Sequence, residues 1–379
     1  MMLKVSFILV VCSLTFQGII AANNVVCYYA SWGASRPGNG KITAKDIPAN
    51  LCTHVFYAFL GLNDDGSLLI MNETLDVDLG NLKGISDLKQ INPNLKAIFS
   101  VGGAAADTAV FESVAEDPEK RKNLANSAID LCKQYNYDGI DIDWEYPEIN
   151  ATFVALLKDL KGYLEPHGLL LAAAVDQLPF NAAYDVRNMS KYLDILNIMS
   201  YDFHSPYYQT GQNSPLYFTP KEGEWQRDNL NANSSMVHWI QYGATPEKMT
   251  MGCGFYGKAM ILADPSKHDI MDPVATANSP GPYTDNIGTL GYNEICEFHI
   301  NSSTVVWEDD QKVPYLYEDT LWVGYDDERS VSLKAQYVKD HNLFGLMMWS
   351  VETDDAYGYC GNGNWPLLNA INKVMKEDL

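Results

Sequence analysis

Basic residues are scarce in this chain of 379 residues, which carries 26 Lys and Arg residues against 48 Asp and Glu residues. The formal net charge is −22. A surface this acidic would repel nucleic acid and anionic membranes, so neither is expected as a partner. A neutral or cationic substrate is compatible with this charge, and so is acidity that serves only solubility.

Histidine is also rare, and none of the seven histidines forms the HxH or HExxH pattern of a zinc site. No low-complexity tract, charge block or Pro/Ser-rich linker divides the chain. With 47% hydrophobic and 12% aromatic residues, the chain can bury a large core as one big domain or two ordinary ones. This composition excludes a disordered or fibrous protein.

Long apolar runs are confined to the N-terminus. Residues 1–22 carry Lys4, then an apolar run, then two alanines, which is the pattern of a removable secretory signal peptide. A membrane anchor is the alternative, but three polar residues interrupt the run and no second apolar span follows. The protein is therefore expected to be secreted and extracellular.

Removal of that leader would leave six of the seven cysteines, and some of these should pair in an oxidising compartment. Five Asn-x-Ser/Thr triplets fit a secreted eukaryotic product, although such triplets also arise by chance. The candidate glycosylation sites are Asn72, Asn150, Asn188, Asn233 and Asn301.

One pattern recurs along the chain: apolar, β-branched runs that end in small or polar residues, separated by helix-like stretches. Eight runs are expected to be strands, the number that closes a (β/α)8 TIM barrel, an α/β fold. They span residues 25–30, 53–59, 96–101, 139–144, 169–175, 195–200, 249–254 and 344–349. A Gly-, Pro- and aromatic-rich stretch, about residues 258–325, is expected to form an α+β subdomain inserted between strands seven and eight.

Two helices should flank the fourth of these strands. Asp117 suits an N-cap and Pro118 the first helical position, and apolar residues between 124 and 135 form one face. A second helix is expected over about residues 152–164. In a barrel built this way, catalytic groups gather at the C-terminal ends of the strands.

The fourth strand is unusually acidic, since DGIDIDWEYP, residues 138–147, holds four carboxylates within eight positions. Because side chains alternate between the two faces, Asp141, Asp143 and Glu145 should face the barrel interior while residues 140, 142 and 144 pack outward. Asp138 is out of phase and is expected in the preceding turn as a structural residue. Alternate residues lie roughly 6.5 Å apart, so at least one carboxyl should keep its proton and serve as a general acid, with Glu145 the outermost.

Two other interpretations of these acids are open. A metal site is one, because Asp-x-Asp-x-Glu resembles a cation ligand set, but Tyr146 stands where a calcium loop needs glycine. A purely structural role is the other, and it is disfavoured because three buried carboxylates are costly to keep for packing alone. Neither a metal nor another cofactor is expected.

Five segments, taken in order, match one known family. They are CYYASWGASRPGNG with LCTHVFYAF, FSVGGA, DGIDIDWEYP, IMSYDFH and GLMMWSVETDD. Together they resemble glycoside hydrolase family 18, the chitinases and chitinase-like proteins of the secreted animal type, whose DxxDxDxE signature is complete here. The resemblance runs from about residue 25 to the C-terminus and implies one catalytic domain over residues 23–379, with no separate chitin-binding module.

The resemblance implies a retaining, substrate-assisted hydrolysis of β-1,4-linked N-acetylglucosamine, an exception to the scheme with two carboxylates. Glu145 would protonate the leaving oxygen, and the substrate's own 2-acetamido carbonyl would be the nucleophile. Asp143 would hold the acetamido N–H, and Asp141 would share a proton or hydrogen bond with it, so that the pair titrates together. Tyr201 would donate its hydroxyl to the acetamido carbonyl.

A sugar-binding cleft lined by aromatic side chains is implied as well. Trp349 would form the floor at the cleavage point, Trp32 would be a platform for a more distant sugar, and Asp202 would contact the sugar. The other expected wall residues are Met199, Tyr28, Phe59 and Tyr256. Without the resemblance, each of these aromatic residues is more typical of a core or rim position.

Two further features follow from the resemblance. It implies disulfides between Cys27 and Cys52 and between Cys296 and Cys360, with the remaining two cysteines as buried thiols. It also exposes a departure, since Ala104 stands where many members carry a tryptophan that stacks on a sugar.

The expected protein is therefore a secreted, monomeric chitinase acting on chitin or chito-oligosaccharides. The alternative is a catalytically silent chitin-binding lectin or growth-factor-like protein of the same fold. Silent relatives typically replace the glutamate that stands here as Glu145, so its presence favours the enzyme.

Overall fold

Eight parallel strands close into a barrel in the computed structural model, which describes residues 24–377. Around the barrel, β1 pairs with both β2 and β15, and the remaining neighbours follow in chain order. The strands are β1 Asn24–Ala30, β2 His54–Leu62, β4 Lys96–Gly102, β5 Gly139–Asp143, β6 Leu170–Val175, β7 Ile195–Ile198, β8 Met249–Gly254 and β15 Gly345–Trp349. The predicted (β/α)8 TIM barrel is confirmed, whereas the predicted signal peptide, residues 1–22, lies outside the described residues.

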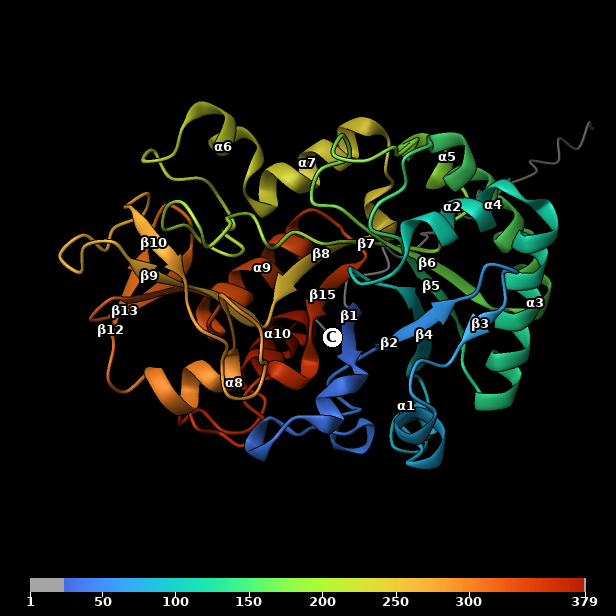
Figure 1. Cartoon of the computed structure of the whole chain (residues 1–379), viewed down its shortest axis with the longest axis horizontal. Coiled ribbons are helices and arrows are strands. Elements are labelled where there is room, and N and C mark those ends of the chain that lie inside the picture. The colour runs from blue at the N-terminus through green and yellow to red at the C-terminus, as the bar shows by residue number, and fades with distance from the viewer. Residues whose placement is uncertain (1–23, 378–379) are drawn as a thin grey trace, which may run out of the picture.

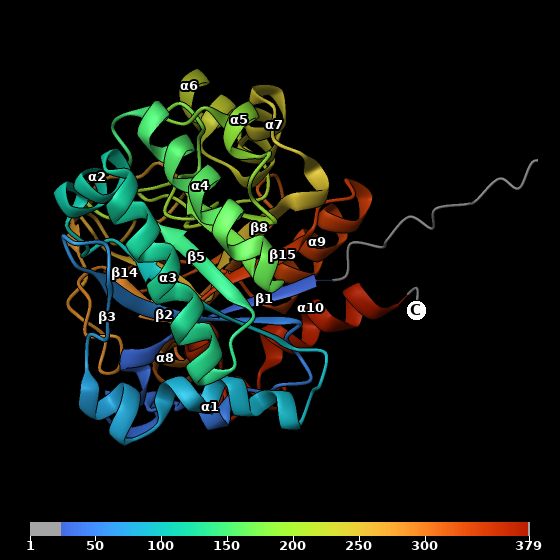
Figure 2. The same ribbon diagram turned by 90° about the vertical axis from the view of Figure 1, so that its right-hand side faces the viewer.

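Helices cover the outside of the barrel (Figures 1 and 2). They are α1 Asn81–Asp87, α2 Thr108–Glu116, α3 Pro118–Tyr135, α4 Asn150–Leu164, α5 Val186–Met189, α6 Glu224–Asn229, α7 Ala232–Tyr242, α9 Glu328–Asp340 and α10 Pro366–Lys376. The expected N-cap is present, because the Asp117 carboxylate accepts a hydrogen bond from the Glu119 amide at 2.8 Å and Pro118 opens α3. The next helix begins at Asn150, earlier than the start expected near residue 152.

A second, antiparallel sheet is formed by the chain segment that connects the seventh barrel strand, β8, to the eighth, β15. It is drawn in orange on the left of Figure 1. Its strand order is β10-β9-β14-β13-β12, with β11 on β9. The elements are β9 Tyr256–Leu262, β10 Val274–Ala277, β11 Thr289–Gly291, α8 Tyr292–Glu294, β12 Thr304–Glu308, β13 Val313–Glu318 and β14 Leu321–Gly324. The insertion is thus α+β, as expected, and it starts directly after the end of β8, which brings Tyr256 to the mouth of the barrel.

The alternation expected for β5 is present in the structure. Ile140, Ile142 and Trp144 are buried in the layer between the barrel and its helices, while the aspartates between them face inward. The Trp144 ring lies 5.4 Å from the Phe111 ring, and its Nε1 donates a hydrogen bond to Thr108 Oγ1 at 2.9 Å. This outward packing anchors the strand that carries the acidic motif.

Asp138 lies before β5, at the opposite end of the barrel from Glu145. Its Oδ2 accepts a hydrogen bond from the Ala97 amide at 2.8 Å and lies 2.5 Å from Lys89 Nζ. The structural role expected for this residue agrees with these contacts, which tie the turn before β5 to β4.

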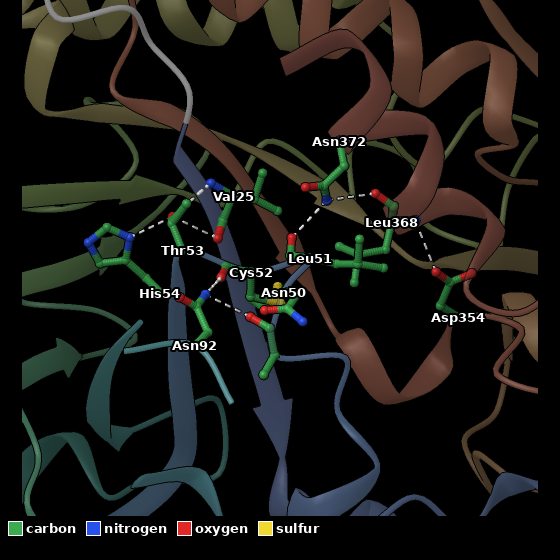
Figure 3. The surroundings of a disulfide bond; sticks show 12 residues. Val25, Asn50, Leu51, Cys52, Thr53, His54, Asn92, Asp354, Leu368 and Asn372 are labelled. Atoms are coloured by element: carbon green, nitrogen blue, oxygen red, sulfur yellow. Dashed lines mark hydrogen bonds between the residues drawn. A yellow bond between two sulfur atoms is a disulfide. The ribbon is translucent and has the colours of Figure 1, made fainter. Parts of the chain in front are cut away.

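Two disulfides are formed, between Cys27 and Cys52 and between Cys296 and Cys360, the pairing that the resemblance implies. Cys132 and Cys253 are buried free thiols. Figure 3 shows the first disulfide's surroundings, where Asn372 of α10 donates a hydrogen bond to the Leu51 carbonyl at 2.7 Å. The C-terminal helix is thereby fastened to the chain just before β2.

The sequon asparagines differ in accessibility. Asn72, Asn150 and Asn301 are exposed, whereas Asn188 and Asn233 are half-buried and hydrogen-bonded through their side chains. Glycan occupancy stays a prediction. Over residues 24–377, no helix is long and apolar enough to cross a membrane.

Candidate active site

A cleft of about 670 Å³ opens at the C-terminal ends of the barrel strands. Most of the predicted catalytic and sugar-binding residues line it together: Trp32, Phe59, Asp143, Glu145, Met199, Tyr201, Asp202, Tyr256 and Trp349. The other two, Asp141 and Tyr28, lie one pleat deeper in the barrel and support the lining from below. The spatial grouping expected from the sequence is therefore present.

Asp141 is fully buried beneath the cleft, with an exposed fraction of 0%. Its Oδ2 accepts hydrogen bonds from Ser100 Oγ at 2.6 Å and from the Tyr28 hydroxyl at 2.8 Å. Burial raises the pKa of Asp141 to about 6, and these hydrogen bonds oppose that rise because they favour the ionised form. Asp141 can therefore gain or lose a proton near neutral pH.

The support for Asp141 extends across the barrel. The Tyr28 hydroxyl accepts a hydrogen bond from Asn197 Nδ2 at 2.9 Å, and Asn197 Oδ1 accepts one from Thr250 Oγ1 at 2.8 Å. These side chains come from β1, β7 and β8, so the network fixes the carboxylate from several strands at once. Asp141 Oδ1 and Asp143 Oδ1 are buried without a hydrogen-bond partner, which leaves both oxygens free for a shared proton or a substrate group.

The two outer carboxyls also resist ionisation. Burial raises the pKa of Asp143 well above its ordinary value, and the charges of Glu145 and Asp141 raise it further. Burial likewise raises the pKa of Glu145, with the charges of Asp202 and Asp176 adding to the effect. Both carboxyls therefore hold a proton more readily than an exposed acid does, as expected for crowded carboxyls, and both line the cleft.

The backbone geometry at the end of β4 requires the two consecutive glycines of FSVGGA. Gly102 and Gly103 both have positive φ values, 117° and 83°. A Cβ on Gly102 would lie 2.1 Å from the Asp143 carbonyl oxygen, and one on Gly103 would lie 2.4 Å from the Phe59 ring. Only glycine lets this backbone approach both the end of β5 and the Phe59 ring so closely.

Tyr201 and Asp202 follow the end of β7. Tyr201 is buried, and its carbonyl accepts a hydrogen bond from Gln177 Nε2 at 3.0 Å. Asp202 Oδ1 accepts a hydrogen bond from the Tyr256 hydroxyl at 2.5 Å and lies 2.8 Å from Lys258 Nζ. Asp202 is thus held at the rim of the cleft by the inserted sheet.

Aromatic rings form the floor and one wall of the cleft. The Trp349 ring stacks on the Phe59 ring, with centroids 5.5 Å apart and planes inclined by 20°. The Trp32 and Tyr28 rings lie 6.0 and 5.9 Å from Trp349. Trp32 is 44% exposed, so its face is available to a ligand beyond the cleft floor.

Sequence reasoning missed several residues of the site. Ser100 and Asn197 occupy inward-facing positions of β4 and β7, and strand phase was the signal that could have found them. Lys258 lies two residues after Tyr256 on β9, on the same face of that strand. Asp176, which follows β6 directly, accepts hydrogen bonds at Oδ1 from the Leu178 amide and Asn181.

Two groups outside the cleft that contain buried carboxylates have structural roles. Glu352 is buried, and its carboxylate accepts hydrogen bonds at 3.1 Å from the Ala30 amide and from Arg36. Within the described part of the chain, one group has the spacing of metal ligands, Cys296 and Cys360 with Asp355, but its sulfurs form a disulfide. That group therefore offers no metal site.

The family model for glycosyl hydrolases family 18 matches residues 24–354. Chitotriosidase-1 of Mus musculus is 33% identical over 375 residues, covering 94% of this chain and 78% of that protein. The structure of Ostrinia furnacalis Group IV chitinase, solved with allosamidin, superposes with a TM-score of 0.90 at 40% identity and covers 94% and 99% of the two chains. Human YKL-39, described as a pseudo-chitinase that retains chitooligosaccharide binding, gives a TM-score of 0.87 at 32% identity, covering 93% and 99%.

Proposed function

The chain belongs to glycosyl hydrolase family 18, and we propose that it is an active chitinase that cleaves β-1,4-linked N-acetylglucosamine chains with retention of configuration. The observation that carries this proposal is Glu145, which lines the cleft beside Asp143 and has a pKa raised by burial. A protonated carboxyl in that place can supply the proton that the leaving oxygen needs.

The proposed reaction uses the substrate's own 2-acetamido group. Its carbonyl oxygen forms a bond to C1 as the glycosidic C–O bond breaks, and the leaving oxygen takes the proton of Glu145. Water, deprotonated by Glu145, then opens the resulting oxazolinium ion on the face from which the leaving group departed, which restores the original configuration.

The inner aspartates stabilise the positive charge that develops on the acetamido group in this scheme. Asp143 accepts a hydrogen bond from the acetamido N–H, and Asp141 shares a proton with Asp143, so that the pair keeps one negative charge. The Tyr201 hydroxyl donates to the acetamido carbonyl, and the Trp349 face supports the sugar ring. The free Oδ1 atoms of the two aspartates support this assignment.

We also propose that the protein is secreted and acts as a monomer, on a substrate that is uncharged. Neither a metal nor a cofactor has a part in the proposed reaction, because proton transfer and the acetamido group account for each bond that forms or breaks.

A silent sugar-binding protein is the second candidate, because YKL-39, a structural neighbour, is described as a pseudo-chitinase. The complete acidic motif in this chain, ending in Glu145, favours the enzyme.

Chitohexaose with detection of product anomers is the test of the proposed function. We expect shorter oligomers whose newly formed reducing ends are initially in the β configuration. Binding without cleavage would support the silent protein, and α products would contradict the retaining mechanism.

The pH dependence of kcat/KM tests the role of the buried aspartates. Activity requires the Asp141 and Asp143 pair to keep a negative charge, so it should fall as the pH drops through the pKa of the pair. Ser100→Ala removes a hydrogen bond that favours ionised Asp141. The pKa should therefore rise, and the acidic limb of the profile should move to higher pH by about one unit.

Ser86→Ala is the matched control for this shift, since Ser86 is a buried serine of α1 whose Oγ donates to the Lys83 carbonyl, away from the cleft. An unchanged acidic limb in Ser100→Ala would show that Asp141 does not govern it.

Ala104→Trp should restore a stacking platform in the cleft wall. Ala104 is exposed and lines the cleft next to the two glycines. An added ring should lower KM for chitohexaose by roughly 2- to 10-fold, the range of one aromatic contact, with little change for chitotriose. Ala104→Leu controls for bulk without a ring face, and an equal effect on both oligomers would refute the stacking role.

A further inference from the structure

The cleft continues beyond its aromatic floor to an aliphatic wall. This wall is made by residues of β2, of the short strand β3 (Leu68–Leu69) and of the chain around the start of α2. Figures 1 and 2 show β3 and α2 on the same flank of the barrel. We call this wall the apolar arm, defined by Leu62, Leu69, Met71, Ala104 and Val110, all of which line the same cavity as Glu145.

Close backbone packing shapes the arm. Gly61 of β2 pairs with Leu69 of β3, and a Cβ on Gly61 would lie 2.6 Å from Met71 Sδ. Met71 therefore lies flat against the glycine, and the small Ala104 side chain faces the same cavity. The result is an open aliphatic surface rather than a filled one.

The arm leaves apolar surface in contact with water. Leu69 is 43% exposed and Met71 64% exposed. Three polar residues border it and are hydrogen-bonded within the protein: Asn72 Oδ1 accepts from the Leu75 amide, Asp76 from the Tyr57 hydroxyl of β2, and Asp107 Oδ1 from the Ala109 amide. Exposed apolar side chains that line the same cavity as a candidate active site can bind an apolar group.

The arm differs in kind from the sugar-binding floor. The floor offers the stacked rings of Trp349 and Phe59, with Trp32 beside them, whereas none of the five residues that define the arm is aromatic. Flexible aliphatic side chains, methionine above all, adapt to an alkyl chain rather than to a rigid, hydroxylated ring.

We propose that the apolar arm binds an aliphatic substituent of the substrate, so that the protein prefers acylated or alkylated chito-oligosaccharides to the plain sugar chain. The sugar occupies the aromatic floor beside Glu145, and the alkyl chain lies along Leu69 and Met71. This inference rests on the proposed function for the sugar part of the ligand.

Binding to the Glu145→Gln variant, with N-glycans removed because Asn72 also borders the arm, tests the inference without turnover. The probes are chitopentaose, chitopentaose with an N-hexadecanoyl group at the non-reducing end, and its octyl glycoside, each below its micelle concentration. Burial of two or more methylene groups should make one lipid-bearing probe bind at least about tenfold more tightly than chitopentaose. The end that gives the gain identifies the sugar nearest the arm.

Adding Leu69→Ser and Met71→Ser to the Glu145→Gln variant should bring the affinity for the lipid-bearing probe close to the affinity for chitopentaose. Leu79→Ser is the matched control, because Leu79 is 70% exposed and does not line the cleft. Equal affinities for all three probes would overturn the inference. So would a gain that persists in the arm variant, or one that is lost equally in the Leu79→Ser control, because the gain would then not depend on the arm. Hydrolysis of plain chitopentaose by the unaltered protein tests the proposed function separately.

Discussion

Glu145→Gln is expected to lower the kcat for chitohexaose by about 10³-fold or more, within or beyond the range of general acid catalysis. Glutamine has the same shape as glutamate but no carboxyl proton to give to the leaving oxygen. Because the cleft floor is built by Trp349 and Phe59 rather than by this carboxyl, the Kd for the oligomer should change little. The rate of product formation gives kcat, and calorimetry gives the Kd.

Glu148→Gln is the control for this experiment. Glu148 is an exposed acid three residues along the same segment, and it does not line the catalytic cleft. Its variant should keep full turnover. Near-normal turnover in Glu145→Gln would remove this residue as the proton donor, and loss of binding together with turnover would point to a structural role instead.

The barrel could be predicted because its strands are short apolar runs with a clear phase. In β5, strict alternation of Asp141 and Asp143 with apolar neighbours was enough to place the acids inside the barrel and Trp144 outside it. The same phase, continued two residues beyond Asp143, the last residue of the strand, placed Glu145 at the cleft.

What the sequence could not supply are contacts between strands far apart in the chain. The Tyr28 hydroxyl bridges Asp141 and Asn197 because barrel closure brings β1 opposite β5 and β7. The ion pair of Lys258 with Asp202 depends on how the inserted sheet folds back over the barrel mouth. Neither contact can be predicted from a local periodicity of the sequence.

Short elements were missed for a related reason. β3 has two residues, too few for a periodic pattern, yet its pairing with Gly61 turns Leu69 and Met71 toward the cleft. The aliphatic wall of the site is therefore a product of tertiary structure, whereas the acidic strand can be read from the order of its residues.

The acetamido group at the cleavage position should be indispensable, and chito-oligosaccharides with glucosamine there should resist hydrolysis. An intramolecular nucleophile held in place can be worth effective concentrations of about 10⁵ M or more, so we expect the rate to fall by at least about 10³-fold. The protein offers no ready substitute, because Asp141 and Asp143 are buried and resist ionisation.

Hexamers with known acetylation patterns test this prediction. A hexamer deacetylated only at a sugar away from the cleavage position should remain a substrate, whereas a fully deacetylated hexamer should bind and persist. Rapid cleavage of the fully deacetylated chain would mean that a carboxylate of the protein attacks C1, and the covalent intermediate expected for such an enzyme should then be trapped on that residue. The opposite result is the expected one: the fully deacetylated hexamer persists, and the partly acetylated hexamer gives β-configured products. The nucleophile is then a group of the substrate, and the protein's part is the proton transfer by Glu145.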